Sequence, residues 1–133
     1  MVSLRAAIEV CDTRFAAWAQ QGEWSRLADQ ACHGALIVGS GTPDVQAAQP
    51  LAQGVALIVN GAVAVQHASW KNPAGDPLRL LVWLANEGAR SLGGLRAGQW
   101  VTTGSCTGTV LVAPGTVVAA DLPGLGRAEI HLV

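Results

Sequence analysis

Short runs of apolar residues, broken by turn-forming residues, recur along most of this chain. The apolar stretches Ala6–Val10 and Ala35–Val38 have the length of buried strands. Val55–Val59 and Ala62–Gln66 flank Asn60–Gly61, a dipeptide that suits the positive φ angles of a type I′ turn. The pattern therefore predicts two early strands and then a β-hairpin.

Two helices are predicted. The first spans Ser25–Ala31, with Ser25 as its N-cap. The longer one spans Asp76–Leu92, because Asp76 can cap the free N–H groups and Pro77 suits the first helical position. A Gly-Gly pair follows and ends it. We expect its apolar face to pack on a sheet. That face consists of Leu78, Leu81, Val82, Ala85, Ala89 and Leu92.

Four further strands are predicted after the long helix, at Trp100–Thr103, Val110–Val112, Val117–Ala120 and Ala128–Leu132. The last one alternates apolar and polar residues, so one of its faces should be wet. The chain is therefore predicted to be one α+β domain over residues 1–133. We expect it to be predominantly β, with a curved mixed sheet on which the long helix packs.

Composition limits the partners of the chain. Half of its 133 residues are hydrophobic, the mean hydropathy is +0.35 and only 13% are charged, which is apolar for a soluble domain of this size. No apolar run is long enough to span a bilayer, and the N-terminus lacks a signal-peptide pattern. We therefore expect a partner to cover the excess apolar surface, either another copy of the chain or the remaining part of a larger fold.

Charge and cysteine content exclude other classes. The net charge is −1 and the eight Lys and Arg residues are scattered, so nucleic acid is not an expected partner. Cys11, Cys32 and Cys106 form no C-x-x-C pair, which argues against a disulfide framework or a zinc site and favours reduced thiols in a cytoplasm. Cys106 is interpreted as structural, because no His lies in a recognisable partner motif.

The run VTTGSCTG at Val101–Gly108 is the stretch most suggestive of chemistry. Its glycines allow the backbone to approach a ligand closely, and Thr103, Ser105 and Thr107 supply hydroxyls beside the backbone N–H groups. Such a turn can bind an anion. The alternative is an ordinary tight turn, which glycine and threonine between strands often form.

The sequence around this run, Asp76–Leu132, resembles the C-terminal part of the 2-keto-4-pentenoate hydratase and 4-oxalocrotonate decarboxylase family, within the fumarylacetoacetate hydrolase superfamily. The segments AIEVCDTRFAAW at Ala7–Trp18 and LADQACHGALIVG at Leu27–Gly39 are similar to the family as well. The resemblance implies a β-roll fold. It also implies a lyase of aromatic catabolism that hydrates 2-hydroxy-2,4-dienoates or decarboxylates a related 2-oxo acid.

The resemblance also implies site residues. Glu9 matches one of three acidic ligands that hold Mg²⁺ or Mn²⁺ in the family, whereas the pattern alone predicts a solvent-facing residue of a half-buried strand. Asp29 matches an acidic residue near the substrate cleft and is the candidate catalytic residue, with a surface position on a helix as the alternative. Thr103, Gly104 and Ser105 match the turn that hydrogen-bonds the carboxylate of a small 2-oxo acid.

Two neighbouring residues are interpreted as structural. Arg14 is expected to pair with Asp12 or with a loop carbonyl, because its permanent charge makes it a poor catalytic base. The resemblance implies that His33 stands where the family has Ser, so it is either an altered pocket residue or a loop histidine. We favour the loop histidine because no second metal-type ligand lies at useful spacing.

Family members are about twice as long, and their N-terminal half carries a Glu-x-Glu pair that supplies the other two acidic ligands. This sequence contains no Glu-x-Glu. We therefore expect weak or absent binding of Mg²⁺ or Mn²⁺ by this chain alone, with a complementary N-terminal-half chain or a homo-oligomer completing the assembly. Two functions stay open: a truncated or split hydratase-family enzyme, and a non-catalytic small-carboxylate-binding or assembly module.

Overall fold

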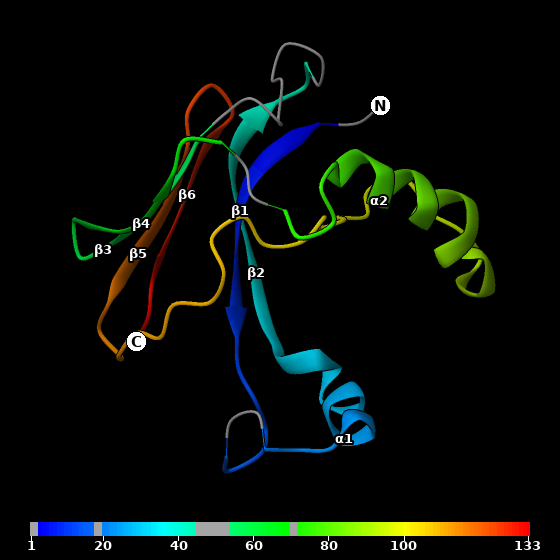
Figure 1. Cartoon of the computed structure of the whole chain (residues 1–133), viewed down its shortest axis with the longest axis horizontal. Helices are drawn as coiled ribbons and strands as arrows, with labels where there is room; N and C mark the ends of the chain where they lie inside the picture. Colours follow the sequence, from blue (N-terminus) through cyan, green and yellow to red (C-terminus); the bar gives the residue numbers. More distant parts are fainter. Residues whose placement is uncertain (1–2, 18–19, 45–53, 70–71) are drawn as a thin grey trace.

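The computed structural model describes residues 3–17, 20–44, 54–69 and 72–133, and its strands form two sheets (Figure 1). In the first sheet, β1 (Leu4–Cys11) pairs with β2 (His33–Thr42). The second sheet has the strand order β4-β3-β5-β6. Its members are β3 (Val55–Val59), β4 (Ala62–His67), β5 (Val117–Leu122) and β6 (Gly126–His131).

All strand pairs of the described residues are antiparallel, so the predicted mixed sheet is wrong. The pairs β3–β4 and β5–β6 are closed by short turns, which can only join antiparallel strands. The mostly β architecture is confirmed.

The predicted hairpin turn is confirmed. Asn60 and Gly61 have φ angles of 48° and 81°, as a type I′ turn requires. The side chain of Asn60 also accepts a hydrogen bond of 2.9 Å from the backbone N–H of Val117. The turn is thereby attached to β5, the strand beside it.

The core lies on one face of the four-stranded sheet, where β1 packs against it. Ala6 is the fully buried residue that β1 contributes. Partly buried apolar residues of β1 and of the 93–116 segment, among them Ile8 and Val110, surround this cluster. The core residues from the other elements are Val55, Leu57, Val118, Ala120, Leu122, Leu125 and Ala128.

The first helix begins earlier than predicted. Helix α1 spans Glu23–Ala28, and Gly22 precedes it in extended conformation, so Ser25 lies inside the helix and is not its N-cap. The helix also ends before the predicted Ala31. The φ angles of Gln30–Cys32 are 54°, 53° and 67°, and left-handed residues cannot continue a right-handed helix.

The second helix starts as predicted. Helix α2 spans Pro77–Trp83, and the carboxylate of Asp76 accepts a hydrogen bond of 2.9 Å from the N–H of Leu78. The chain continues through a π-helical turn at Leu84–Gly88 and a 3₁₀ turn at Arg90–Leu92. Within the described residues, no helix combines the length and hydropathy needed to cross a membrane.

The packing of α2 departs from the prediction. Leu78 and Leu81 face a groove beside β1, but Val82 and Leu92 are 59% and 82% exposed. Figure 1 shows the helix extending away from both sheets. The apolar face is therefore longer than the sheet surface that the described residues offer to it.

The strands predicted at Trp100–Thr103 and Val110–Val112 do not form, because the structure leaves both segments outside its sheets. Trp100 and Leu111 are 58% and 84% exposed. A strand needs a neighbour to satisfy its backbone N–H and C=O groups, and no described strand lies in register with these segments.

Candidate functional site

A groove of about 1000 Å³ lies between β1, the start of α2 and the segment 95–112. Glu9 lines it from the middle of β1, and Thr103, Gly104 and Ser105 line it from the glycine-rich run. The tertiary structure thus brings these four predicted site residues to one space. Asp29 is not among the lining residues.

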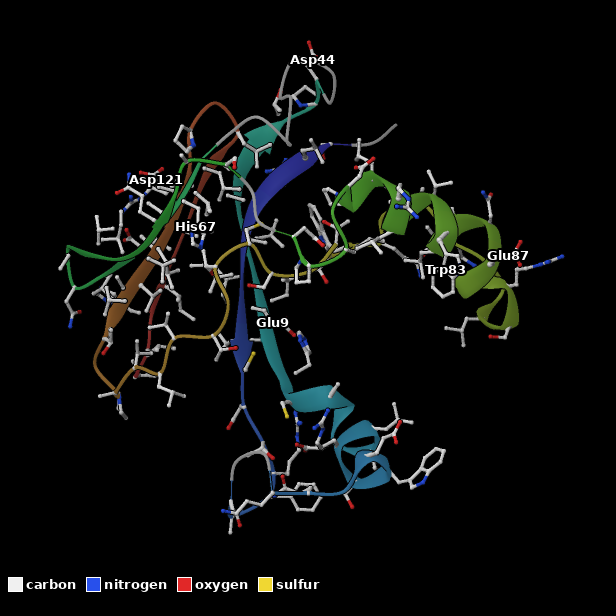
Figure 2. All side chains as sticks on the ribbon, viewed as in Figure 1. Glu9, Asp44, His67, Trp83, Glu87 and Asp121 are labelled. Carbon is white, nitrogen blue, oxygen red and sulfur yellow. The ribbon has the colours of Figure 1, made fainter. Side chains whose placement is uncertain are left out.

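Glu9 projects from β1 beside the beginning of β2, and its side chain is 49% exposed (Figure 2). Its Oε1 atom lies 3.0 Å from Nδ1 of His33. His33 is the first residue of β2, so the predicted loop histidine is in fact a strand residue in contact with Glu9. The antiparallel pairing of β1 with β2 places Cys11 opposite His33, and this register brings the His33 side chain to Glu9, two residues before Cys11.

Asp29 is buried at the end of α1, with 2% of its side chain exposed. Its carboxylate accepts hydrogen bonds from the hydroxyl of Thr13 at 2.7 Å and from Nη1 of Arg14 at 2.9 Å. These two hydrogen bonds, the one from Thr13 first, lower the pKa of Asp29 below its ordinary value. Asp29 is therefore a buried carboxylate whose negative charge is stabilised by hydrogen bonds from Thr13 and Arg14.

Arg14 binds Asp29 rather than the predicted partner Asp12. The same guanidinium also donates to the carbonyl oxygens of Asp29, at 2.9 Å, and His33, at 2.7 Å. The expectation that Arg14 would bind a loop carbonyl is thus met. Through these bonds the buried carboxylate holds the backbone where β2 begins.

Asn72 holds the glycine-rich run in place, a contact that sequence reasoning missed. Its Nδ2 atom donates a hydrogen bond of 2.6 Å to the carbonyl oxygen of Thr103, while its Oδ1 atom accepts from the N–H of Ala74. Gly104, next to Thr103, has a φ of 100°, and a Cβ there would lie 3.3 Å from Nδ2 of Asn72. The one local signal was the Asn-Pro dipeptide, which is typical of a turn.

Ser105 stabilises the turn from within. Its hydroxyl oxygen accepts hydrogen bonds from the N–H groups of Gly108, at 2.9 Å, and Thr107, at 3.2 Å. Cys106 is half-buried against the core, and burial raises the pKa of its thiol. A neutral, packed thiol fits the structural role expected for Cys106.

The side chains at this site could supply some, but not all, of the ligands of a divalent metal ion. Among the residues that the structure describes, no group of three or more His, Cys, Asp or Glu side chains is arranged to hold a metal ion. Glu9 offers one carboxylate, a ligand type that Mg²⁺ and Mn²⁺ accept, and His33 stands beside it. A complete site needs further ligands.

Residues 5–133 match the family described as fumarylacetoacetate (FAA) hydrolase C-terminal. The chain also resembles two solved structures of 4-oxalocrotonate decarboxylase from Pseudomonas putida G7. The structure complexed with magnesium and adipate is 28% identical, with a TM-score of 0.82, and the match covers 98% of this chain and 49% of that chain. For the structure complexed with calcium and acetate, the identity is 27%, the TM-score is 0.76, and the coverage is 98% and 48%. The chain thus spans about half the length of the decarboxylase chains that it matches.

Proposed function

This chain belongs to the fumarylacetoacetate hydrolase C-terminal family, and we propose that it supplies one half of a lyase site for 2-oxo acids. The reaction would be hydration of a 2-hydroxy-2,4-dienoate or decarboxylation of a related 2-oxo acid. The groove carries this proposal, because Glu9 and the run Thr103–Ser105 line the same space. The likeness to a decarboxylase complexed with magnesium and adipate, a dicarboxylate, supports the pairing of a metal ion with an organic anion.

In this proposal each residue has a distinct task. Glu9 contributes one oxygen ligand to a divalent ion, which when bound would polarise the 2-oxo group of the substrate. Thr103, Gly104 and Ser105 orient the substrate carboxylate with hydroxyl and backbone groups. Asp29 is buried and is not among the residues that line the groove. We therefore assign it a positioning role through Arg14, in place of the catalytic role that the resemblance implied.

The remaining ligands would come from residues outside this sequence. Candidates are a complementary polypeptide and a second copy of the chain. Large apolar side chains of α2 and of the 93–116 segment, such as Trp83 and Leu111 at 61% and 84% exposed, support such a partner. Covering this surface would bring new side chains to the open groove.

A second candidate function is a non-catalytic module that binds small carboxylates or supports assembly. It is favoured by the lack of a three-ligand metal cluster among the described residues. In that case the glycine-rich run would bind an anion without help from a metal.

Pyruvate titration separates the two functions. We expect pyruvate to shift the NMR signals of Gly104 and Ser105 in the 133-residue chain. If the chain supplies half of a lyase site, Mg²⁺ should strengthen pyruvate binding in the wild type but not in Glu9→Gln. Glu87→Gln is the matched control, because Glu87 is an exposed residue that pairs with Arg90 away from the groove. A pyruvate affinity that changes neither with Mg²⁺ nor in Glu9→Gln would favour the non-catalytic module. The absence of any NMR shift at Gly104 and Ser105 would contradict both functions.

A further inference from the structure

We propose that His33 is a second metal ligand beside Glu9, and that the pair forms a mixed nitrogen and oxygen half-site for a first-row transition ion such as Ni²⁺, Co²⁺ or Zn²⁺. The inference rests on the proposed function, in which Glu9 is a metal ligand. It adds a residue and a class of ion to that site. Imidazole nitrogen suits these ions, whereas Mg²⁺ prefers an all-oxygen site.

The geometry of the pair supports two adjacent ligands. Nδ1 of His33 and Oε1 of Glu9 are 3.0 Å apart. Two ligand atoms bound at about 2.1 Å and at right angles around an octahedral ion such as Ni²⁺ or Co²⁺ are separated by about 3.0 Å, and around a tetrahedral Zn²⁺ by about 3.4 Å. An ion can therefore bind both atoms at this separation once the exposed imidazole turns so that the lone pair of Nδ1 points at the ion instead of at Oε1, and any proton on Nδ1 is released to solvent.

The side chains are also accessible. The exposed fractions are 41% for the His33 side chain and 49% for that of Glu9. Glu9 lines the open groove, and His33 lies beside Glu9 without being one of the lining residues. Water or residues from a partner can fill the remaining positions of the ion from the groove side. The site needs them, because two ligands alone hold a divalent ion loosely.

The backbone of His33 is held firmly for this task. Nη2 of Arg14 donates a hydrogen bond of 2.7 Å to the carbonyl oxygen of His33, and Arg14 is itself bound to the buried carboxylate of Asp29. The three left-handed residues Gln30–Cys32 lead directly into His33. Such a conformation is costly for residues other than glycine and is common near functional sites. The loop thus places an imidazole next to the carboxylate of Glu9.

Metal titrations of the 133-residue chain at pH 7.5 test the inference. Ni²⁺ binding is measured by calorimetry, and Mn²⁺ binding by loss of the free-ion EPR signal. We expect His33→Gln to weaken Ni²⁺ binding at least about tenfold and Mn²⁺ binding less than about twofold, because Mn²⁺ favours oxygen ligands. Glu9→Gln should weaken both. His131→Gln, on an exposed residue of β6, is the matched control and should change neither.

Long-range ¹H–¹⁵N NMR of the wild-type imidazoles keeps the test independent of any variant that folds poorly. Zn²⁺ should move the Nδ1 signal of His33 and leave that of His131 in place. Unchanged Ni²⁺ binding in His33→Gln, or a Zn²⁺ shift confined to His67 or His131, would overturn the inference. If Glu9→Gln weakens metal binding and His33→Gln does not, Glu9 remains a metal ligand as in the proposed function, and the assignment of His33 as a ligand is wrong. If Glu9→Gln changes neither ion, both the pair and the metal role in the proposed function are wrong.

Discussion

The backbone of Gly39 in β2 lies directly against the carbonyl group of Arg127 in β6, leaving no space for a side chain on Gly39. Beside this contact, the hydroxyl oxygen of Ser40 accepts a hydrogen bond of 2.9 Å from the N–H of Arg127. The two sheets meet here. The junction therefore sets how β2, and with it β1 and Glu9, sits against the core.

Gly39→Ala should lower the free energy of unfolding by about 2–3 kcal/mol, because the new methyl group would overlap backbone atoms of Arg127 and Ala128. Urea denaturation followed by tryptophan fluorescence measures the effect. Gly22→Ala is the control, since Gly22 has an ordinary φ of −63° and a Cβ there meets no atom within 4 Å. Equal stability of Gly39→Ala and the wild type would show that the sheets are not closely joined at this point.

The Asp29 carboxylate should make stability depend on acid pH. Its pKa is lowered in the folded chain, so its stabilisation is complete above the unfolded pKa of about 3.9 and is lost as pH falls toward the lowered folded value. Urea denaturation at pH 7 and pH 3 should show a smaller difference in Asp29→Asn, which cannot take up the proton. An equal or larger difference in the variant would contradict this role.

Thr13→Val should lower the free energy of unfolding by about 1–2 kcal/mol, because it leaves the buried carboxylate of Asp29 without one donor while nearly keeping the volume of the side chain. Denaturation in urea at pH 7 measures the change. Thr109→Val, at an exposed position, serves as the control and should be close to neutral. Loss of stability equal in both variants would mean that the hydroxyl of Thr13 has no special role.

Asn72→Ala should weaken pyruvate binding without unfolding the chain. The variant loses the hydrogen bond of 2.6 Å to the carbonyl oxygen of Thr103, so the run before Ser105 is no longer held in its ligand-binding geometry. We expect millimolar binding, about −4 kcal/mol, in the wild type and a loss of at least about threefold in the variant. NMR titration gives both constants. Ser105→Ala should also weaken binding, and unchanged affinity in both variants would mean that the run is a structural turn without a ligand-binding role.

The chain alone should show no appreciable hydratase or decarboxylase activity with Mg²⁺ or Mn²⁺. Glu9 is one carboxylate, and a weakly held ion cannot efficiently polarise a substrate. A spectrophotometric assay with a 2-hydroxydienoate tests this. Turnover that disappears in Glu9→Gln would contradict the prediction and show that the chain completes its own site.

Sedimentation should show an assembly larger than one chain at micromolar concentration. The reason is the exposed apolar surface, including Trp24 and Leu92 at 80% and 82% exposed, together with the unpaired side of β4 at the end of the described sheet. Val82→Glu on the outer face of α2 should reduce the association if this helix takes part. A stable monomer without aggregation would show that the chain needs no covering partner.

Features set by neighbouring residues were predictable from the sequence alone. The hairpin at Asn60–Gly61 depends on the tolerance of these two residues for positive φ. The start of α2 depends on the hydrogen bond that the N–H of Leu78 donates to the side chain of Asp76. The resemblance to the fumarylacetoacetate hydrolase superfamily was also found from sequence segments, and residues 5–133 match its C-terminal family. The hairpin and helix signals are each contained within a few consecutive residues, and the resemblance is read along the sequence without any knowledge of the fold.

The contacts that build the candidate site needed the tertiary structure. Glu9 and His33 are 24 residues apart, Arg14 and Asp29 are 15 apart, and Asn72 and Thr103 are 31 apart. Strand register and loop path decide these pairs, and neither leaves a local pattern. The same reason explains the error at Trp100–Thr103. Alternating or apolar residues can predict an extended backbone, but a strand forms only where another strand lies close enough to share its hydrogen bonds.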